Sequence, residues 1–149
     1  MTFRIGTEPL DGAALRSALL RHDAGACVVF EGWVRDVNDG RSVTRLEYEA
    51  YEPLAVKEGE TILEEARSRF GLLDAVCVHR VGPLELGDVA VWVGVVSGHR
   101  DAAFAACRYV IDEVKSRVPI WKKEHYTAGD SGWVNCERCA ADGQRNHGT

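Results

Sequence analysis

The feature that most constrains this fold is a continuous apolar run, VAVWVGVV, at residues 89–96. The run is bounded by Gly87-Asp88 before it and by Ser97-Gly98 after it. A Val-rich run of this length predicts a strand that is buried on both faces. We therefore expect the rest of the chain to be organised around this strand.

A helix and a further strand are expected to follow the run. The helix opens at Asp101, and its apolar residues recur at helical spacing to form one stripe: Ala103, Cys107, Val110, Ile111, Val114 and Val118. Pro119 ends the helix, because proline lacks an N–H and pushes the preceding residue out of the α region. Residues 120–124, IWKKE, are short and partly alternating, which predicts another strand.

The earlier part of the chain supplies the other elements. Helices are expected at residues 10–22 and 53–70, and strands at residues 2–5, 26–35, 42–51 and 74–81. The turn signal Asn38-Asp39-Gly40 predicts that residues 26–35 and 42–51 form a β-hairpin. Gly59 weakens the second helix, so its early part is expected to be irregular. Together these elements predict an α+β domain with a mixed sheet, one hairpin and two to three helices.

Length and charge narrow the class of protein. The 149 residues fit a single domain, expected at residues 1–135, followed by a weakly ordered tail at residues 136–149. A formal net charge of −5 argues against a general binder of nucleic acid or anionic membranes. No apolar stretch reaches about 20 residues, and the N-terminus lacks a signal-peptide core. We expect a cytoplasmic protein whose five cysteines are reduced thiols.

The segment Ser97-Gly98-His99-Arg100 lies between a strand end and a helix start. Backbone N–H groups at a helix N-terminus carry partial positive charge, and a neighbouring arginine can complete an anion site. Arginine suits phosphate because its guanidinium binds two oxygens at once. The alternative is that His99 caps the turn and Arg100 pairs with a surface carboxylate.

Three lysines are candidates for chemistry. Lys115 borders the apolar stripe of its helix, where loss of water would lower its pKa and make it usable as a base or nucleophile. Alternatively, its stem covers apolar surface while the ammonium remains in water. Lys122 and Lys123 point to opposite faces of the expected strand, so one of them could line the same pocket as Lys115. The alternative is an edge strand protected by lysines.

The cysteines do not indicate a catalytic or metal site. Cys27, Cys77 and Cys107 fall in strand or helix patterns typical of core thiols. Cys136 and Cys139, with His147 downstream, have zinc-like spacing, but the second pair of ligands is incomplete. We therefore expect neither a metal nor another cofactor.

Five segments of the chain are similar to one known family. They are FEGWVRDVNDG (30–40), LEYEAYEPLA (46–55), VHRVGPLELGD (78–88), VGVVSGHRDAAF (93–104) and KSRVPIWKKE (115–124). On these segments the chain resembles the MoaE family, the large catalytic subunits of molybdopterin synthase. The resemblance implies an α/β-hammerhead type of α+β fold. It also implies a sulfurtransferase that converts cyclic pyranopterin monophosphate to the dithiolene-bearing molybdopterin.

The resemblance further implies partners and site residues. The sulfur would come from a ubiquitin-like small subunit with a thiocarboxylated Gly-Gly C-terminus, and a homodimer with two small subunits would form a heterotetramer. Lys115 and Lys122 take the family's catalytic positions. The substrate-binding positions are Phe30, Trp33, Val34, Arg35, His99, Arg100, Lys123 and Glu124.

Two other functions remain open from the sequence. One is a module that docks a ubiquitin-like protein without doing chemistry, although docking alone would need no desolvated lysine. The other is a phosphate-ester or nucleotide enzyme with His99 as general acid or base. That second function would need a carboxylate or metal partner, and none stands at a convincing spacing.

Overall fold

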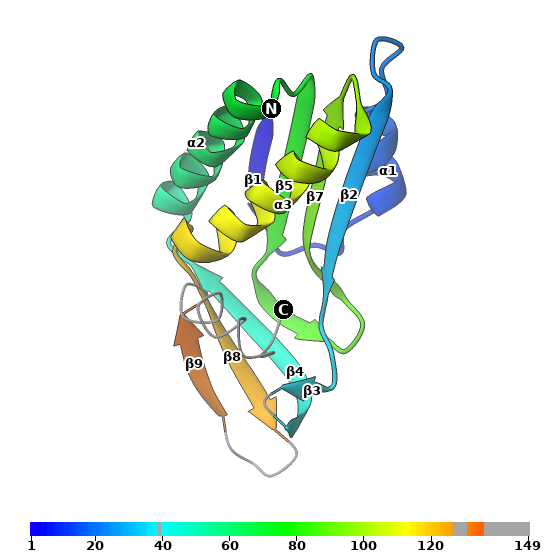
Figure 1. The fold of residues 1–149 in the computed structure, drawn as a ribbon. Coiled ribbons are helices and arrows are strands. Elements are labelled where there is room, and N and C mark those ends of the chain that lie inside the picture. The colour runs from blue at the N-terminus through cyan, green and yellow to red at the C-terminus, as the bar shows by residue number, and fades with distance from the viewer. Residues whose placement is uncertain (39, 127–130, 136–149) are drawn as a thin grey trace.

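The structure, a computed structural model, describes residues 1–38, 40–126 and 131–135. Nine strands form two sheets in this part of the chain, and three helices accompany them (Figure 1). The architecture confirms the predicted α+β class, with three helices and a mixed sheet. The strands, however, form two sheets, and the junction between them positions the candidate site.

The first sheet has the order β1-β5-β7-β2. Its strands are β1 (Thr2–Gly6), β5 (Asp74–Arg80), β7 (Val89–Ser97) and β2 (Ala26–Trp33). β1 pairs with β5 in parallel and the other neighbours are antiparallel, so this sheet is mixed. Every residue of β7 after Val89 is buried, which confirms the prediction for the apolar run.

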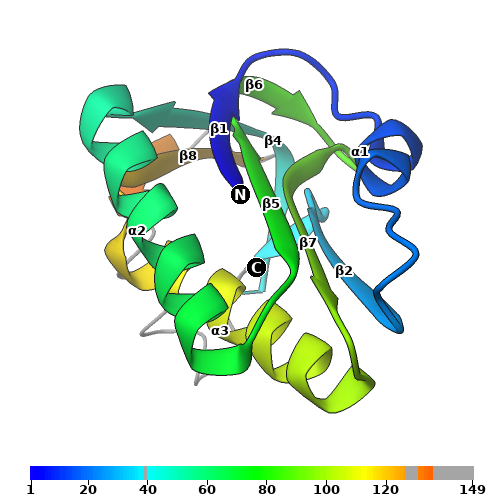
Figure 2. The ribbon, with the colours of Figure 1, turned by 90° about the horizontal axis from the view of Figure 1, so that it is seen from above.

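Helices cover both faces of this sheet (Figure 2). α2 (Glu52–Phe70) and α3 (Arg100–Arg117) lie on one face and close the main hydrophobic core. α1 (Gly12–Ala18) lies on the other face, where Leu19 packs with Trp92 and Val96. α1 is shorter than the predicted residues 10–22: it begins after Asp11, which caps its N-terminus by accepting a hydrogen bond from the Ala14 N–H, and it already ends at Ala18.

The second sheet is built on β4 (Arg41–Ala50). β8 (Ile120–Tyr126) pairs with one edge of β4, and β9 (Ser131–Asn135) pairs with the far edge of β8. The short strands β3 (Val37–Asn38) and β6 (Gly82–Glu85) pair with β4 as well. Because β6 follows β5 after a single residue, the chain passes directly from the first sheet into the second (Figure 1).

The predicted long hairpin is wrong. β2 pairs with β7 in the first sheet, whereas β4 belongs to the second, and only the two residues of β3 fold back onto the start of β4. The turn signal therefore marks a true turn, but of a much smaller hairpin. The alternation within β4 is confirmed, since Leu46 and Tyr48 are buried while Glu49 is exposed.

α2 is a continuous helix, so the predicted irregularity near Gly59 is absent. Pro53 lies in its first turn, and Gly71 ends it with a positive φ of 67°. Gly59 is buried where the ring of Phe3 crosses the helix, and a Cβ at this position would overlap that ring. The glycine thus permits β1 and α2 to approach each other closely.

α3 and β8 follow the predictions. The buried residues of α3 are the expected stripe with the addition of Ala106. Val118 adopts an extended conformation before Pro119, and β8 begins at the next residue. None of the helices in the described ranges is long and apolar enough to cross a membrane. The predicted tail at residues 136–149, with Cys136 and Cys139, lies outside the described residues.

Candidate active site

His99 and Arg100 lie where β7 gives way to α3. His99 is the N-cap residue, Arg100 is the first helical residue, and both side chains are exposed. The side chain of His99 makes no capping hydrogen bond, so the alternative in which it caps the turn is wrong. The two cationic candidates therefore stand at an exposed helix N-terminus, which is favourable for an anion.

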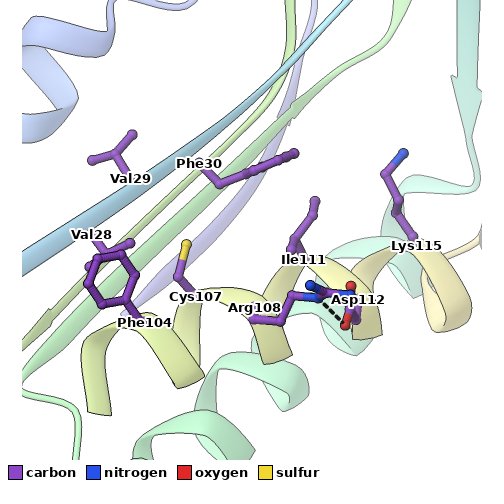
Figure 3. Close-up of a pocket in the computed structure, with 9 residues that line it drawn as sticks. All are labelled: Val28, Val29, Phe30, Phe104, Cys107, Arg108, Ile111, Asp112 and Lys115. Atoms are coloured by element: carbon purple, nitrogen blue, oxygen red, sulfur yellow. Dashed lines mark hydrogen bonds and ion pairs between the residues drawn. The ribbon is translucent and has the colours of Figure 1, made fainter. Parts of the chain in front are cut away.

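Lys115 lies in the last turn of α3, at the end of a groove between this helix and the edge strand β2 (Figure 3). The groove has a volume of 430 Å³. Its lining is Val28, Val29, Phe30, Phe104, Cys107, Arg108, Ile111, Asp112 and Lys115. Lys115 is half-buried, and Figure 3 shows that Ile111 and Lys115 rise from α3 toward the strands. This position confirms that Lys115 borders the apolar stripe.

Lys122 is buried in the inner face of the second sheet. Only 4% of the residue is exposed, and its Nζ lies 3.7 Å from Oε1 of Glu124, which is 2% exposed. The two residues share one face of β8, while Lys123 points to the opposite face and is half-buried. Because β9 pairs with the outer edge of β8, the alternative of an edge strand protected by lysines is wrong.

A tyrosine and a histidine connect the surroundings of the two lysines. Tyr48 of β4 is directly opposite Lys122 in the strand register. Its ring contacts the ring of His79 edge to face, with centroids 4.9 Å apart. His79 in turn lies near Lys115, whose charge helps to lower the pKa of the imidazole. Neither Tyr48 nor His79 stands out from the sequence pattern as a site residue, although both fall within segments that carry the family resemblance.

The candidates on β2 and after it have different environments. Phe30 lines the groove, whereas the side chain of Val34 is 3% exposed and packs in the core. Trp33, the last residue of β2, and Arg35, two residues after it, are exposed. Of these four candidates, Phe30 is the one that lines the groove together with Lys115.

The two cationic groups are not brought together within one chain. Arg100 and Lys115 occupy opposite ends of α3. At about 1.5 Å per residue, the fifteen-residue separation places their backbones about 22 Å apart. The chain thus offers one cationic group at each end of the same helix.

The cysteines in the described ranges do not form a reactive centre. Cys77 and Cys107 are buried, and burial raises the pKa of both thiols, that of Cys107 to about 11. Cys27 is exposed on β2, which corrects its assignment to the core, and partial burial still raises its pKa. Raised pKa values keep these groups as thiols, which are poor nucleophiles. Within the same ranges no cluster of His, Cys, Asp and Glu could hold a metal ion.

Fold and site together define an α+β protein whose candidate chemistry rests on two lysines at the junction of two sheets. The family described as MoaE protein matches residues 5–117, which is more than half of the chain. The chain belongs to this family of molybdopterin synthase catalytic subunits. The family match ends at Arg117 and does not include Lys122. In the structure, Lys122 pairs with Tyr48, which lies within the matched residues.

Relatives and solved structures agree with this assignment. A molybdopterin synthase catalytic subunit from Synechococcus elongatus is 50% identical over 115 residues, covering 75% of this chain and 70% of the relative. The crystal structure of molybdopterin synthase from Staphylococcus aureus is 40% identical, with a TM-score of 0.82. That similarity covers 87% of this chain and 94% of the Staphylococcus chain.

A more distant structure shows the same fold in a complex. It is the complex of subunits 1 and 2 of molybdopterin-converting factor from Helicobacter pylori, 22% identical to this chain with a TM-score of 0.73. The similarity covers 89% of each chain. This similarity shows that the two proteins share a fold.

Proposed function

We propose that this chain transfers sulfur from a thiocarboxylated, ubiquitin-like small subunit to cyclic pyranopterin monophosphate, forming the dithiolene of molybdopterin in the cytoplasm. Each thiocarboxylate supplies one sulfur, and its carbonyl carbon ends as a carboxylate after water replaces the sulfur. The observation that carries the proposal is the buried Lys122–Glu124 pair close to the Tyr48–His79 contact and Lys115.

A buried ion pair needs an explanation other than stability. Removing two charges from water costs several kcal/mol, and apolar residues of similar volume often stabilise a core as well or better. We take that explanation to be the chemistry of the site. We assign Lys122 and Lys115 as the catalytic lysines, and Glu124 as the group that holds the Lys122 amine in place.

The groove beside Lys115 suits the extended C-terminus of the partner. From Phe104 to Lys115 it follows α3 for eleven residues, a length of about 16 Å, which corresponds to about five extended residues. A Gly-Gly terminus would fit the narrow end because it carries no side chains. Exposed Val29, Trp33 and Phe104 provide apolar surface around the groove for a partner domain.

The anionic substrate requires the remaining cationic groups. We assign the monophosphate to His99 and Arg100 at the N-terminus of α3, with Arg35, Lys123, Trp33 and Phe30 as further substrate-binding positions. Val34 packs in the core, so it can take part only through its backbone. A pterin monophosphate is only about half as long as the 22 Å that separates the two ends of α3. A homodimer resolves this geometry by placing Arg100 of one copy beside Lys115 of the other, and one small subunit at each end gives a heterotetramer.

Reconstitution tests the function directly. The chain is incubated with cyclic pyranopterin monophosphate and a thiocarboxylated small subunit, and dithiolene product is measured. Product formation is expected, and it should be absent when the small subunit lacks its last two glycines. Binding of the partner without any product would instead favour a module that docks a ubiquitin-like protein.

A further inference from the structure

His79 is a buried imidazole that the proposed sulfur transfer has not yet used. It is 6% exposed and lies near the end of β5, on the same face as Ala75 and Cys77, which belong to the core beneath α2 and α3. Three residues later, Gly82 pairs with Tyr48 in the second sheet. His79 therefore stands at the junction between the two sheets.

The hydrogen bond of the ring fixes its tautomer. Nδ1 of His79 lies 2.8 Å from the backbone carbonyl oxygen of Arg80. A carbonyl oxygen can only accept, so Nδ1 carries the hydrogen and donates it. In the neutral ring Nε2 is then unprotonated, and its lone pair points away from Arg80 on the opposite side of the imidazole.

The path of α3 directs its last turn toward the part of the sheet that carries His79. α3 follows β7 after two residues and runs back across the sheet, so its C-terminal turn lies toward the start of β7 (Figure 1). There Val91 pairs with His79 on one side and with Gly32 on the other. Lys115 belongs to that turn of α3 and extends toward the strands (Figure 3).

The electrostatics of the site agree with this placement. Burial, and to a smaller extent the charge of Lys115, lower the pKa of His79 to about 4, although the hydrogen bond to the Arg80 carbonyl acts in the opposite direction. At neutral pH the ring is therefore uncharged, and the lone pair of Nε2 is suited to accept a hydrogen bond from an amine.

We propose that His79 is a positioning residue for Lys115, acting through the lone pair of Nε2 to hold the lysine amine at the end of the groove. The inference rests on the proposed function, in which the Lys115 amine must meet the partner's terminal carbonyl group. A lysine with four rotatable side-chain bonds at a helix end has many orientations, and one fixed acceptor selects among them. An amine displaced by about 1 Å can cost a hundredfold in rate.

Two substitutions distinguish the role of Nδ1 from the role of Nε2. In His79→Asn the amide can still donate to the Arg80 carbonyl, but no acceptor remains at the position of Nε2. In His79→Gln the amide oxygen can replace Nε2 as acceptor. We expect His79→Asn to lower kcat about tenfold or more without raising KM, and His79→Gln to recover most of that loss. Equal activity of the two folded variants would overturn the inference.

A measurement without turnover tests the contact itself. The ¹⁵N chemical shifts of the His79 ring are compared between the wild type, Lys115→Ala and Lys57→Ala at pH 7.5. Lys115→Ala should shift Nε2 and leave Nδ1 nearly unchanged, whereas Lys57→Ala removes an equal charge from the exposed surface of α2 and should shift neither. An Nε2 signal unaffected by Lys115→Ala would overturn the inference. If the wild type forms no dithiolene, the proposed function fails, and the spectra still decide whether His79 holds Lys115.

Discussion

Lys115 and Lys122 differ in how the protein surrounds their amines. Lys115 is half-buried at the end of a groove, and truncating it removes the amine from a partly open site. We expect Lys115→Ala to lower kcat by about a hundredfold or more, the range typical of a lost proton-transfer group. The melting temperature and partner binding should change little. Retention of most activity in steady-state assays would remove Lys115 from the mechanism.

Replacing Lys122 should affect the stability of the protein as well as its activity. Lys122→Ala leaves the Glu124 carboxylate buried without the amine that lies 3.7 Å away. We therefore expect the free energy of unfolding to fall by about 3–5 kcal/mol and turnover to be lost. The double variant Lys122→Met/Glu124→Gln should recover stability but remain inactive. Urea unfolding and product assays on both proteins check this, and an active double variant would contradict a catalytic Lys122.

At the scale of elements, the contact between α2 and β1 depends on one glycine. A Cβ at position 59 would overlap the Phe3 ring, and such overpacking costs about 1–3 kcal/mol. Because the overlap with the ring is severe, we expect the upper end of that range, about 3 kcal/mol. Alanine favours the helix by about 1 kcal/mol, so Gly59→Ala should destabilise the protein by about 2 kcal/mol in urea unfolding. Adding Phe3→Leu should reduce that cost. If Gly59→Ala is as stable as the wild type, the close approach of the two elements is not required.

α2 and α3 are also joined by an ion-pair cluster. Arg117 binds Glu65 through both terminal nitrogens, and Tyr109 donates a hydrogen bond to the same carboxylate. The bonds from Arg117, and then from Tyr109, lower the pKa of Glu65 to about 2 from its usual 4.5. A lowered carboxyl pKa contributes stability above pH 4.5, and that contribution disappears as the pH falls toward 2.

Glu65→Gln tests the direction of this pH dependence of stability, because a neutral amide resembles the protonated acid. The variant should be less stable than the wild type by about 1 kcal/mol at pH 7, a modest value because water screens the partly exposed pair. The difference should shrink below pH 4.5 and vanish near pH 2 in thermal or urea unfolding. A difference that grows on acidification would contradict the assignment.

At the scale of the whole molecule, the proposed site needs two copies of the chain. Arg100→Ala and Lys115→Ala, each inactive alone, are mixed under conditions that exchange subunits. Each heterodimer should contain one intact site, so random exchange should restore about a quarter of the wild-type activity. Mass spectrometry confirms the exchange. Continued inactivity after exchange would place both residues in the site of one subunit.

Much of this molecule could be predicted from local patterns. The buried strand β7, the apolar stripe of α3, the stop at Pro119 and the alternation of β4 and β8 all follow from the side-chain periods of helices and strands. Lys115 at the margin of the stripe and Lys122 facing away from Lys123 follow from the same periods. These features depend on residues close together in the sequence, and the family resemblance rests on the same segments.

Only the tertiary structure decided how the strands are shared between two sheets. The turn signal at residues 38–40 does not indicate which strand pairs with β2. The backbone groups of β2 bind those of β7, a strand more than fifty residues later in the chain. The junction of the sheets then buries Lys122 with Glu124 and brings His79 to Tyr48 and Lys115, although these residues are far apart in the chain. Gly59 shows the same limit, since helix propensity treats it as a weakness and only the ring of Phe3 explains it. Local periodicity determines on which face of its own helix or strand a side chain lies. The site forms only where faces of elements that are distant in the sequence pack against each other.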